Sequence, residues 1–195
     1  SKLGVLRVRQ CKDFYWDISY LINFRHLRYF EMNGDTHVYG QFPESFGELT
    51  LLSKFSLGGK KEVTGQLTES IGNLKEIIEL SIEGSSLSGT LPNRIGDLET
   101  LTHLNLSFNE FTGQIPPSIG NLTELQQLYL SYNHLTGELP ETMLQIKAIQ
   151  DKTMTLEDLF YNIAIQREET TGNIYFLPCP EWVKKHYGVS DWPEW

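Results

Sequence analysis

Four residues of the kinds that carry out acid–base and nucleophilic chemistry lie close together near the end of the sequence. They are Cys179, Glu181, His186 and Asp191. A cysteine beside a histidine can become a thiolate nucleophile, because the imidazole takes the thiol proton. Such a pair needs a surrounding motif that positions it, and this segment contains no recognisable one. We therefore expect structural or solvated roles for these side chains rather than catalysis.

Other motifs of enzyme chemistry are also missing. The sequence has no H-E-x-x-H, no G-x-S-x-G, no glycine-rich phosphate loop and no close cluster of metal ligands. The five histidines fall in different segments of the chain. The sequence predicts that the protein is not an enzyme and has no catalytic residue, no metal site and no cofactor.

Composition narrows the class of partner. The chain of 195 residues carries a formal net charge of −9, and its basic pairs, Lys60 with Lys61 and Lys184 with Lys185, are too sparse for a basic stripe. No apolar run approaches the roughly 18–20 residues of a membrane span, and the first residues do not resemble a signal peptide. We expect no nucleic-acid partner and no membrane span in this chain.

The dominant feature of the chain is a repeat. Leu101 opens LTHLNLSFNEFTGQIPPSIGNLTE, and Leu125 opens the matching LQQLYLSYNHLTGELPETMLQIKA. Earlier copies, the first of them degenerate, bring the total to six, which open near residues 3, 27, 52, 77, 101 and 125. Self-similarity at such a period is typical of solenoids, in which each repeat forms one coil. We predict a solenoid over residues 1–150 and a capping segment over residues 151–195.

These repeats match L-x-x-L-x-L-x-x-N-x-L-x-G-x-I-P-x-x-I-G-x-L, so residues 3–150 resemble the leucine-rich-repeat family. The G-x-I-P and I-G-x-L segments resemble the subclass of plant receptor ectodomains, which also occurs in some bacterial cell-surface proteins. Plant ectodomains usually carry a cysteine-bearing cap at each end; this chain has neither, which favours a bacterial surface protein or a truncated chain. The resemblance implies an α/β, right-handed solenoid with a parallel sheet on its concave side and short helical turns on its convex side.

The residues of one repeat explain the same architecture physically. In the segment from Leu101, apolar and polar residues alternate, so Leu104 and Leu106 should face inward from a short strand. Asn109 should also face inward, where its amide can satisfy backbone groups of the following turn. We expect the six parallel strands to centre near Val5, Tyr29, Lys54, Glu79, His103 and Gln127.

Departures from the pattern suggest local differences. The asparagine position holds Cys11 and Ser85, and Asp35 or Thr36 in the second coil; we expect Cys11 to be a buried, inert thiol. Outer strands roughly 24 Å apart should keep Cys11 from bonding to Cys179. One extra residue in each of the segments 33–39 and 58–64 predicts small bulges, either binding loops or neutral variation.

The capping segment should be partly helical. Thr155 with Asp158 three residues on is typical of a helix start, and the apolar residues from Leu156 to Ile163 then share one face. Pro180 suits a second helix start, and Gly188 suits its end. Residues 174–177, after Gly172 and Asn173, could add an edge strand. Three tryptophans, Trp182, Trp192 and Trp195, fall in this segment.

Outward positions of the strands form columns across the sheet, and aromatic and amide side chains gather at one end of them. Exposed aromatics flanked by amides are typical binding anchors. For Phe108 and Tyr132, shielding of the sheet edge is an equal alternative. The middle of the face is small, with Ser56, Ser81 and Gly84, and Arg7, Arg9 and Glu31 at the far end should be solvated charges. The candidate ligand-binding residues are Tyr29, His103, Asn105, Phe108, Gln127, Tyr129 and Tyr132.

The pattern favours a module that binds a protein or peptide through the concave face, extracellular or at the cell surface. One alternative is a structural scaffold or adhesion spacer, and another is an inhibitor of a secreted enzyme. Two N-glycosylation sequons, at Asn105 and Asn121, arise from the repeat pattern itself and are weak signals.

Overall fold

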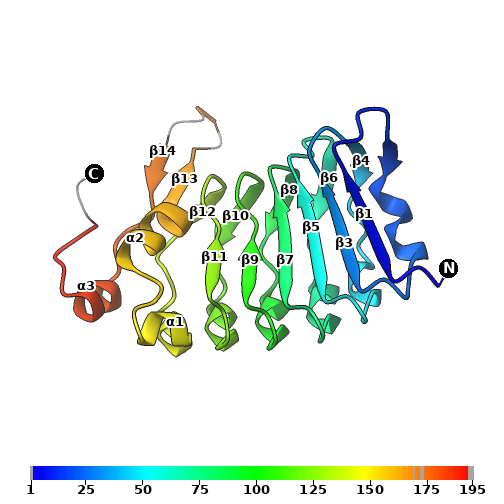
Figure 1. Ribbon diagram of the computed structural model, residues 1–195. Helices are drawn as coiled ribbons and strands as arrows, with labels where there is room; N and C mark the ends of the chain where they lie inside the picture. Colours follow the sequence, from blue (N-terminus) through cyan, green and yellow to red (C-terminus); the bar gives the residue numbers. More distant parts are fainter. Residues whose placement is uncertain (1, 169, 172–173, 193–195) are drawn as a thin grey trace.

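The computed structural model describes residues 2–168, 170–171 and 174–192, and its coils stack side by side from the N-terminus to the C-terminal segment (Figure 1). Six parallel strands form the first sheet, whose outward side we call the concave face. The partners Tyr29, Lys54, Glu79, His103 and Gln127 follow Val5 across the sheet. The predicted sheet and its register are confirmed, although these residues begin the strands rather than centre them. The strands are β1 (Val5–Arg9), β3 (Tyr29–Asn33), β5 (Lys54–Gly58), β7 (Glu79–Glu83), β9 (His103–Asn105) and β11 (Gln127–Tyr129).

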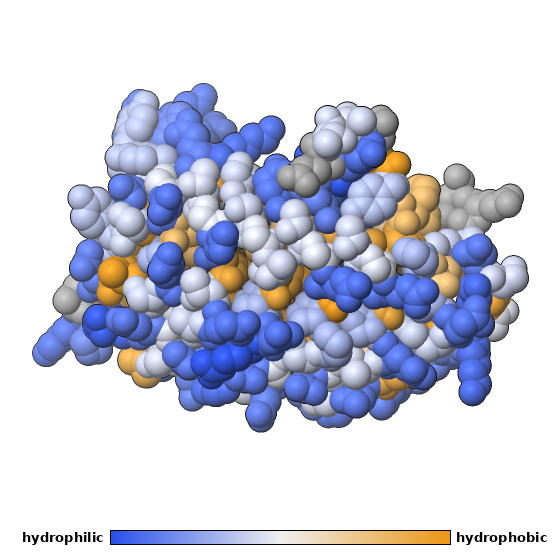
Figure 2. Space-filling model, turned by 180° about the vertical axis from the view of Figure 1, so that it is seen from behind, coloured by the Kyte–Doolittle hydropathy of each residue, from blue (hydrophilic) through white to orange (hydrophobic). Residues whose placement is uncertain are grey.

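A second six-stranded parallel sheet, which the sequence pattern did not predict, follows the first around each coil. Because equivalent segments of adjacent coils lie in register, their backbone groups can pair with one another. Its strands are β2 (Tyr15–Asp17), β4 (His37–Gln41), β6 (Val63–Gln66), β8 (Ser86–Thr90), β10 (Glu110–Gln114) and β12 (His134–Thr136). Seen from behind, the molecule is largely covered by polar side chains, with smaller apolar patches among them (Figure 2).

Short 3-10 turns close each coil on the convex side, as expected. The glycine of each I-G-x-L segment is required there by close approach: a Cβ on Gly120 would overlap the carbonyl oxygen of Thr142 in the next turn. Adjacent turns can therefore pack backbone against backbone. The turns are η1 (Ile18–Asn23), η2 (Phe46–Glu48), η3 (Glu69–Asn73), η4 (Asn93–Asp97), η5 (Pro117–Asn121) and η6 (Glu141–Gln145).

Between the sheets and the turns lies one continuous core. Leu101, Leu104 and Leu106 are fully buried, which confirms their inward register. Stacking of coils makes this core continuous, since no single coil can bury its own apolar face. Among its aromatics, Phe30 stacks on Phe55 with ring centroids 4.5 Å apart.

Buried asparagines join successive coils through hydrogen bonds. The Asn109 side chain is fully buried; its Oδ1 accepts from the Leu87 amide at 3.1 Å, and its Nδ2 donates to the Ile82 and Leu106 carbonyls at 2.7 and 3.1 Å. Asn133 repeats this arrangement one coil later. The prediction that the inward asparagine satisfies backbone groups is confirmed, but its partners lie just before it in its own coil and in the preceding coil, not in the turn that follows.

The third coil places a lysine where the fifth and sixth coils have asparagine. Lys60 is buried, and its Nζ donates to the carbonyls of Gly34 and Thr36 at 2.5 and 2.8 Å. Burial lowers the pKa of Lys60. The extra residue of this coil lies in the turn that precedes Val63, whose amide donates to the Lys60 carbonyl at 2.8 Å.

The first coil differs from the prediction at Cys11, which is exposed rather than buried. Its coil contains β1, the edge strand of the first sheet, so the described part of the chain stacks no coil on its outer side. Both cysteines are free, which confirms that Cys11 and Cys179 do not form a disulfide.

The C-terminal segment is partly helical, as expected. Thr155 and Asp158 form the predicted capping box, but the helix continues only as far as Leu159 before a π turn. The second helix begins after Pro180 and ends at Gly188, whose φ is 73°. Gly172, Asn173 and Trp195 lie outside the described residues. The elements are α1 (Lys147–Gln150), α2 (Leu156–Leu159), η7 (Phe160–Ala164), β13 (Ile165–Arg167), β14 (Ile174–Phe176) and α3 (Glu181–Tyr187), with β13 and β14 paired antiparallel.

Gln166 extends the asparagine arrangement into this segment, which the sequence pattern did not reveal. Its fully buried side chain accepts from the Asn133 and Leu135 amides, each at 3.2 Å, and donates to the Leu130 and Ile163 carbonyls. On the same segment, Trp182 is buried and donates from Nε1 to the Leu139 carbonyl at 2.8 Å. Residues of the segment thus contact the backbone of the last coil.

Candidate ligand-binding surface

Six of the seven candidate residues gather at the C-terminal end of the concave face. His103 lies opposite Gln127, and Asn105 lies opposite Tyr129, on the adjacent strands β9 and β11. In the turns that follow these strands, Phe108 and Tyr132 stack with ring centroids 4.5 Å apart and planes 7° from parallel. Neighbouring coils therefore place the aromatic and amide groups in one continuous patch, which we call the aromatic end.

Tyr29 does not belong to this patch. It lies on β3, and β5 and β7 separate it from β9. Its hydroxyl donates to Oε2 of Glu31 at 2.7 Å, and the Arg7 guanidinium lies 4.5 Å from the centroid of its ring. Tyr29 is therefore part of a charged cluster at the opposite end of the sheet.

Glu31 is the centre of that cluster, and the prediction that it is a solvated charge was wrong. Only 6% of the residue is exposed. Arg9 donates to its two carboxylate oxygens at 2.5 and 2.8 Å, and Arg7 lies 3.1 Å away. The hydrogen bonds from Arg9, with help from Tyr29, lower the pKa of Glu31 from 4.5 to about 2 against the opposing effect of burial.

This lowered pKa predicts an acid-dependent contribution to stability. A carboxylate that binds protons less readily when folded stabilises the fold above its ordinary pKa of 4.5, and the contribution is lost as the pH falls toward about 2. Because Arg7 and Arg9 are 47% and 59% exposed, water screens the pairs, and we expect about 1–2 kcal/mol. Urea unfolding at pH 7 and pH 3 would measure the free energy of unfolding of wild type and Glu31→Gln. We expect the difference between the two proteins to be smaller at pH 3 than at pH 7. The same difference at both pH values would contradict the prediction.

The two stacked aromatics adopt an unusual backbone conformation. The turn residue after each concave strand has positive φ, and it is glycine in three coils, but Phe108 and Tyr132 have φ of 58° and 57°. A left-handed conformation costs a residue with a side chain roughly 1–2 kcal/mol. Phe108 remains 45% exposed, so burial of its ring offsets only part of that cost. The exposed ring is therefore a candidate for contact with a ligand.

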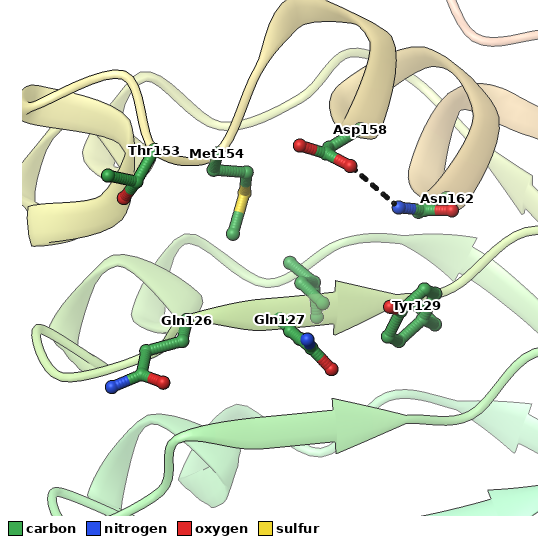
Figure 3. Close-up of a pocket in the computed structure, with 8 residues that line it drawn as sticks. Gln126, Gln127, Tyr129, Thr153, Met154, Asp158 and Asn162 are labelled. Atoms are coloured by element: carbon green, nitrogen blue, oxygen red, sulfur yellow. Dashed lines mark hydrogen bonds between the residues drawn. The ribbon is translucent and has the colours of Figure 1, made fainter.

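The C-terminal segment forms a wall beside Tyr129, as Figure 3 shows. A pocket of about 130 Å³ separates β11 from the loop that leads to α2. Asp158 and Asn162, joined by a 3.4 Å hydrogen bond, face Gln127 and Tyr129 across it. This wall could not be predicted from the sequence, because the register of the repeats says nothing about residues outside them. The lining residues are Gln126, Gln127, Leu128, Tyr129, Thr153, Met154, Asp158 and Asn162.

The middle of the concave face is hollowed into an open groove of about 390 Å³. Its floor is made of serine and glycine, and Phe108 stands at one end of it. The small residues of the middle strands are thus gathered into a surface that a ligand could approach closely. The lining residues are Asn33, Gly34, Ser56, Gly58, Gly59, Ser81, Glu83, Gly84 and Phe108.

The surroundings of Cys179 and His186 disfavour a thiolate–imidazole pair. Burial, with a smaller effect from Asp191, raises the pKa of Cys179 to about 11, so the thiol stays protonated at neutral pH. Nε2 of His186 lies 2.8 Å from the Ile149 carbonyl oxygen. Within residues 2–168, 170–171 and 174–192, no three acidic, histidine or cysteine side chains gather to hold a metal ion. In the same part of the chain no helix has the length and apolar character to cross a membrane.

Comparison with known proteins identifies related folds. The family model "Leucine-rich repeat region" matches residues 1–146, and no curated protein matches the chain. The ectodomain of GASSHO1/SCHENGEN3 from Arabidopsis thaliana, in complex with Casparian strip integrity factor 2, is 27% identical with a TM-score of 0.59 over 71% of this chain. The Arabidopsis HAESA ectodomain, in complex with an IDA peptide hormone, is 32% identical with a TM-score of 0.61 over 66% of it.

A protein with a different role has a similar structure. A plant ice-binding protein is 36% identical, with a TM-score of 0.52 over 55% of this chain and 35% of its own. This chain spans only 20% and 21% of the two receptor structures. The shared architecture carries several functions, so the fold alone assigns none. What the family model and the plant ectodomains share with this chain is its repeat, and the chain belongs to the leucine-rich-repeat family, in its plant-like subclass.

Proposed function

We propose that the protein is a binding module that holds a protein or peptide against its concave face through the aromatic end. The observation that carries this proposal is the patch on β9 and β11, where His103, Asn105, Gln127 and Tyr129 face outward on adjacent strands beside a pocket. Aromatic and amide side chains give large contact area and adaptable hydrogen bonds at low entropic cost. GASSHO1 and HAESA, which are similar to this chain, are described in complex with peptide ligands.

Two further parts of the proposal concern location and architecture. Two of the similar structures, GASSHO1 and HAESA, are receptor ectodomains, which supports an extracellular or cell-surface location for this chain. We infer that residues 151–195 act as a cap, since Gln166 and Trp182 satisfy backbone groups of the last coil. A scaffold or adhesion spacer would use the same solenoid without this patch. An inhibitor of a secreted enzyme would use it with a different partner.

The binding role is tested at Tyr129. Its side chain is half-buried on an outward strand position and lines the pocket. Peptides selected from a random 12-residue display library against the whole chain should bind Tyr129→Ala about thirtyfold more weakly, as expected for a hot-spot tyrosine worth about 2 kcal/mol.

Arg7→Ala is the matched control, because Arg7 lies in the same column at the far end of the sheet. It should change affinity little. Tyr129→Ala should melt close to wild type, whereas Arg7→Ala can lower the melting temperature because Arg7 pairs with the buried Glu31. Equal affinity of the selected peptides for wild type and Tyr129→Ala would place binding outside the aromatic end.

A further inference from the structure

The turn residues with positive φ that follow the concave strands form a row along one edge of the concave face. In the middle of this row three adjacent coils have no side chain. Gly34, Gly59 and Gly84 occupy it in three adjacent coils, and Phe108 and Tyr132 occupy it in the next two. A Cβ placed on Gly59 would meet nothing within 4 Å, and one on Gly84 would meet only backbone atoms of Gly59. Gly59 therefore lies under open space, and Gly84, whose own Cβ direction faces the Gly59 backbone, lines the same open groove together with Phe108.

Phe108 offers a flat apolar surface to this space. One face of its ring is covered by Tyr132 at 4.5 Å, and the ring also lines the groove together with Gly84. The spacing of the stacked pair is close to the distance of about 4.8 Å between neighbouring strands. A planar group over Gly84 would therefore continue the stack by one more layer.

The charge of the groove limits which planar group fits. Glu83 is its only charged lining residue and is exposed. Oε2 of Glu83 accepts a hydrogen bond from Nδ2 of Asn105 at 3.2 Å, and no cation in the described part of the chain pairs with it. The chain as a whole carries a net charge of −9. A cationic group is therefore favoured next to the Phe108 ring.

Resting on the proposed binding role, we propose that this groove takes an arginine side chain of the peptide or protein ligand. The guanidinium stacks on the open face of Phe108 and donates to the carboxylate of Glu83, while the glycine floor lets the ligand backbone approach closely. Arginine fits better than lysine, because a guanidinium is planar and donates in a fork that matches a carboxylate, whereas an ammonium is a compact charge.

The test uses a probe that carries only this chemistry. N-acetyl-arginine-N-methylamide is titrated into the isotope-labelled whole chain, and amide resonances are followed by NMR. We expect saturable shifts at Gly84 and Phe108. The neutral isostere, N-acetyl-citrulline-N-methylamide, should bind about tenfold more weakly or worse, because it keeps the shape and loses the charge.

Two variants locate the site. Phe108→Gly removes the ring and keeps a residue that three other coils have at this position, and Glu83→Gln removes the charge with little change in shape. Each should weaken arginine-amide binding about threefold to tenfold, with melting curves close to wild type. Ile78→Ala is the matched control and should bind the probe like wild type, because Ile78 is exposed and does not line this groove.

Failure of this inference is distinguishable from failure of the proposed function. Equal binding of the arginine and citrulline amides, or arginine binding unchanged in both Glu83→Gln and Phe108→Gly, would overturn the arginine site and leave the aromatic end untouched. If instead the selected peptides bind Tyr129→Ala like wild type while the arginine amide still shifts Gly84, the aromatic end fails and the arginine site stands.

Discussion

Replacing Leu106 by alanine is expected to lower the free energy of unfolding by about 2–5 kcal/mol. The side chain is fully buried in the core that all coils share, so its removal loses transfer free energy and leaves a cavity. Each coil contacts its neighbours tightly, and the surrounding side chains can collapse into the cavity only in part. Urea denaturation followed by circular dichroism would measure the loss.

Ile78→Ala is the matched control for this change. Ile78 is an aliphatic residue that is 51% exposed, and its truncation should change stability by no more than about 0.5 kcal/mol. Similar losses for the two variants, or near-wild-type stability for Leu106→Ala, would mean that the inward register does not describe the protein in solution.

Asn109→Ala is expected to lower the free energy of unfolding by about 1–3 kcal/mol, although the residue contributes little apolar surface. Its side chain bonds the Leu87 amide and the Ile82 and Leu106 carbonyls, and alanine would strand these groups where water cannot replace the lost partner. The loss should be accompanied by faster hydrogen exchange at the Leu87 amide. Asn121→Ala provides the control, because Asn121 is exposed; equal effects at both positions would contradict a structural role for the buried amide.

The sheet could be predicted from the sequence because its information is local and repeated. Each Leu-x-x-Leu-x-Leu segment specifies a strand with one buried face, and six copies in register specify how the strands align. The second sheet was missed, because the segment from Glu110 to Gln114 shows no comparable alternation in every coil. Its strands arise from stacking, which brings like segments of neighbouring coils within hydrogen-bonding distance.

Side chains that act across coils were harder to predict. Lys60 bonds carbonyls of the preceding coil, and Glu31 is buried by arginines on the strand beside it. A lysine and a glutamate read singly are surface residues, and only a packed structure shows when neighbours exclude water from them. For the same reason only part of the candidate site could be predicted. The strands β9 and β11 were placed correctly, whereas the wall formed by Asp158 and Asn162 depends on how the last segment folds back.

Because of the hydrogen bonds of Gln166, the same C-terminal segment can follow any coil that has the structure of the last one. Gln166 makes the same kinds of contact with the last coil that Asn133 makes with the coil before it. Any coil that ends in the same way presents the same amides and carbonyls to this terminus. Duplication or deletion of a whole coil during evolution would therefore lengthen or shorten the sheet without requiring new contacts with the C-terminal segment. The length of the sheet can thus vary by recombination while the contacts that Gln166 makes stay the same.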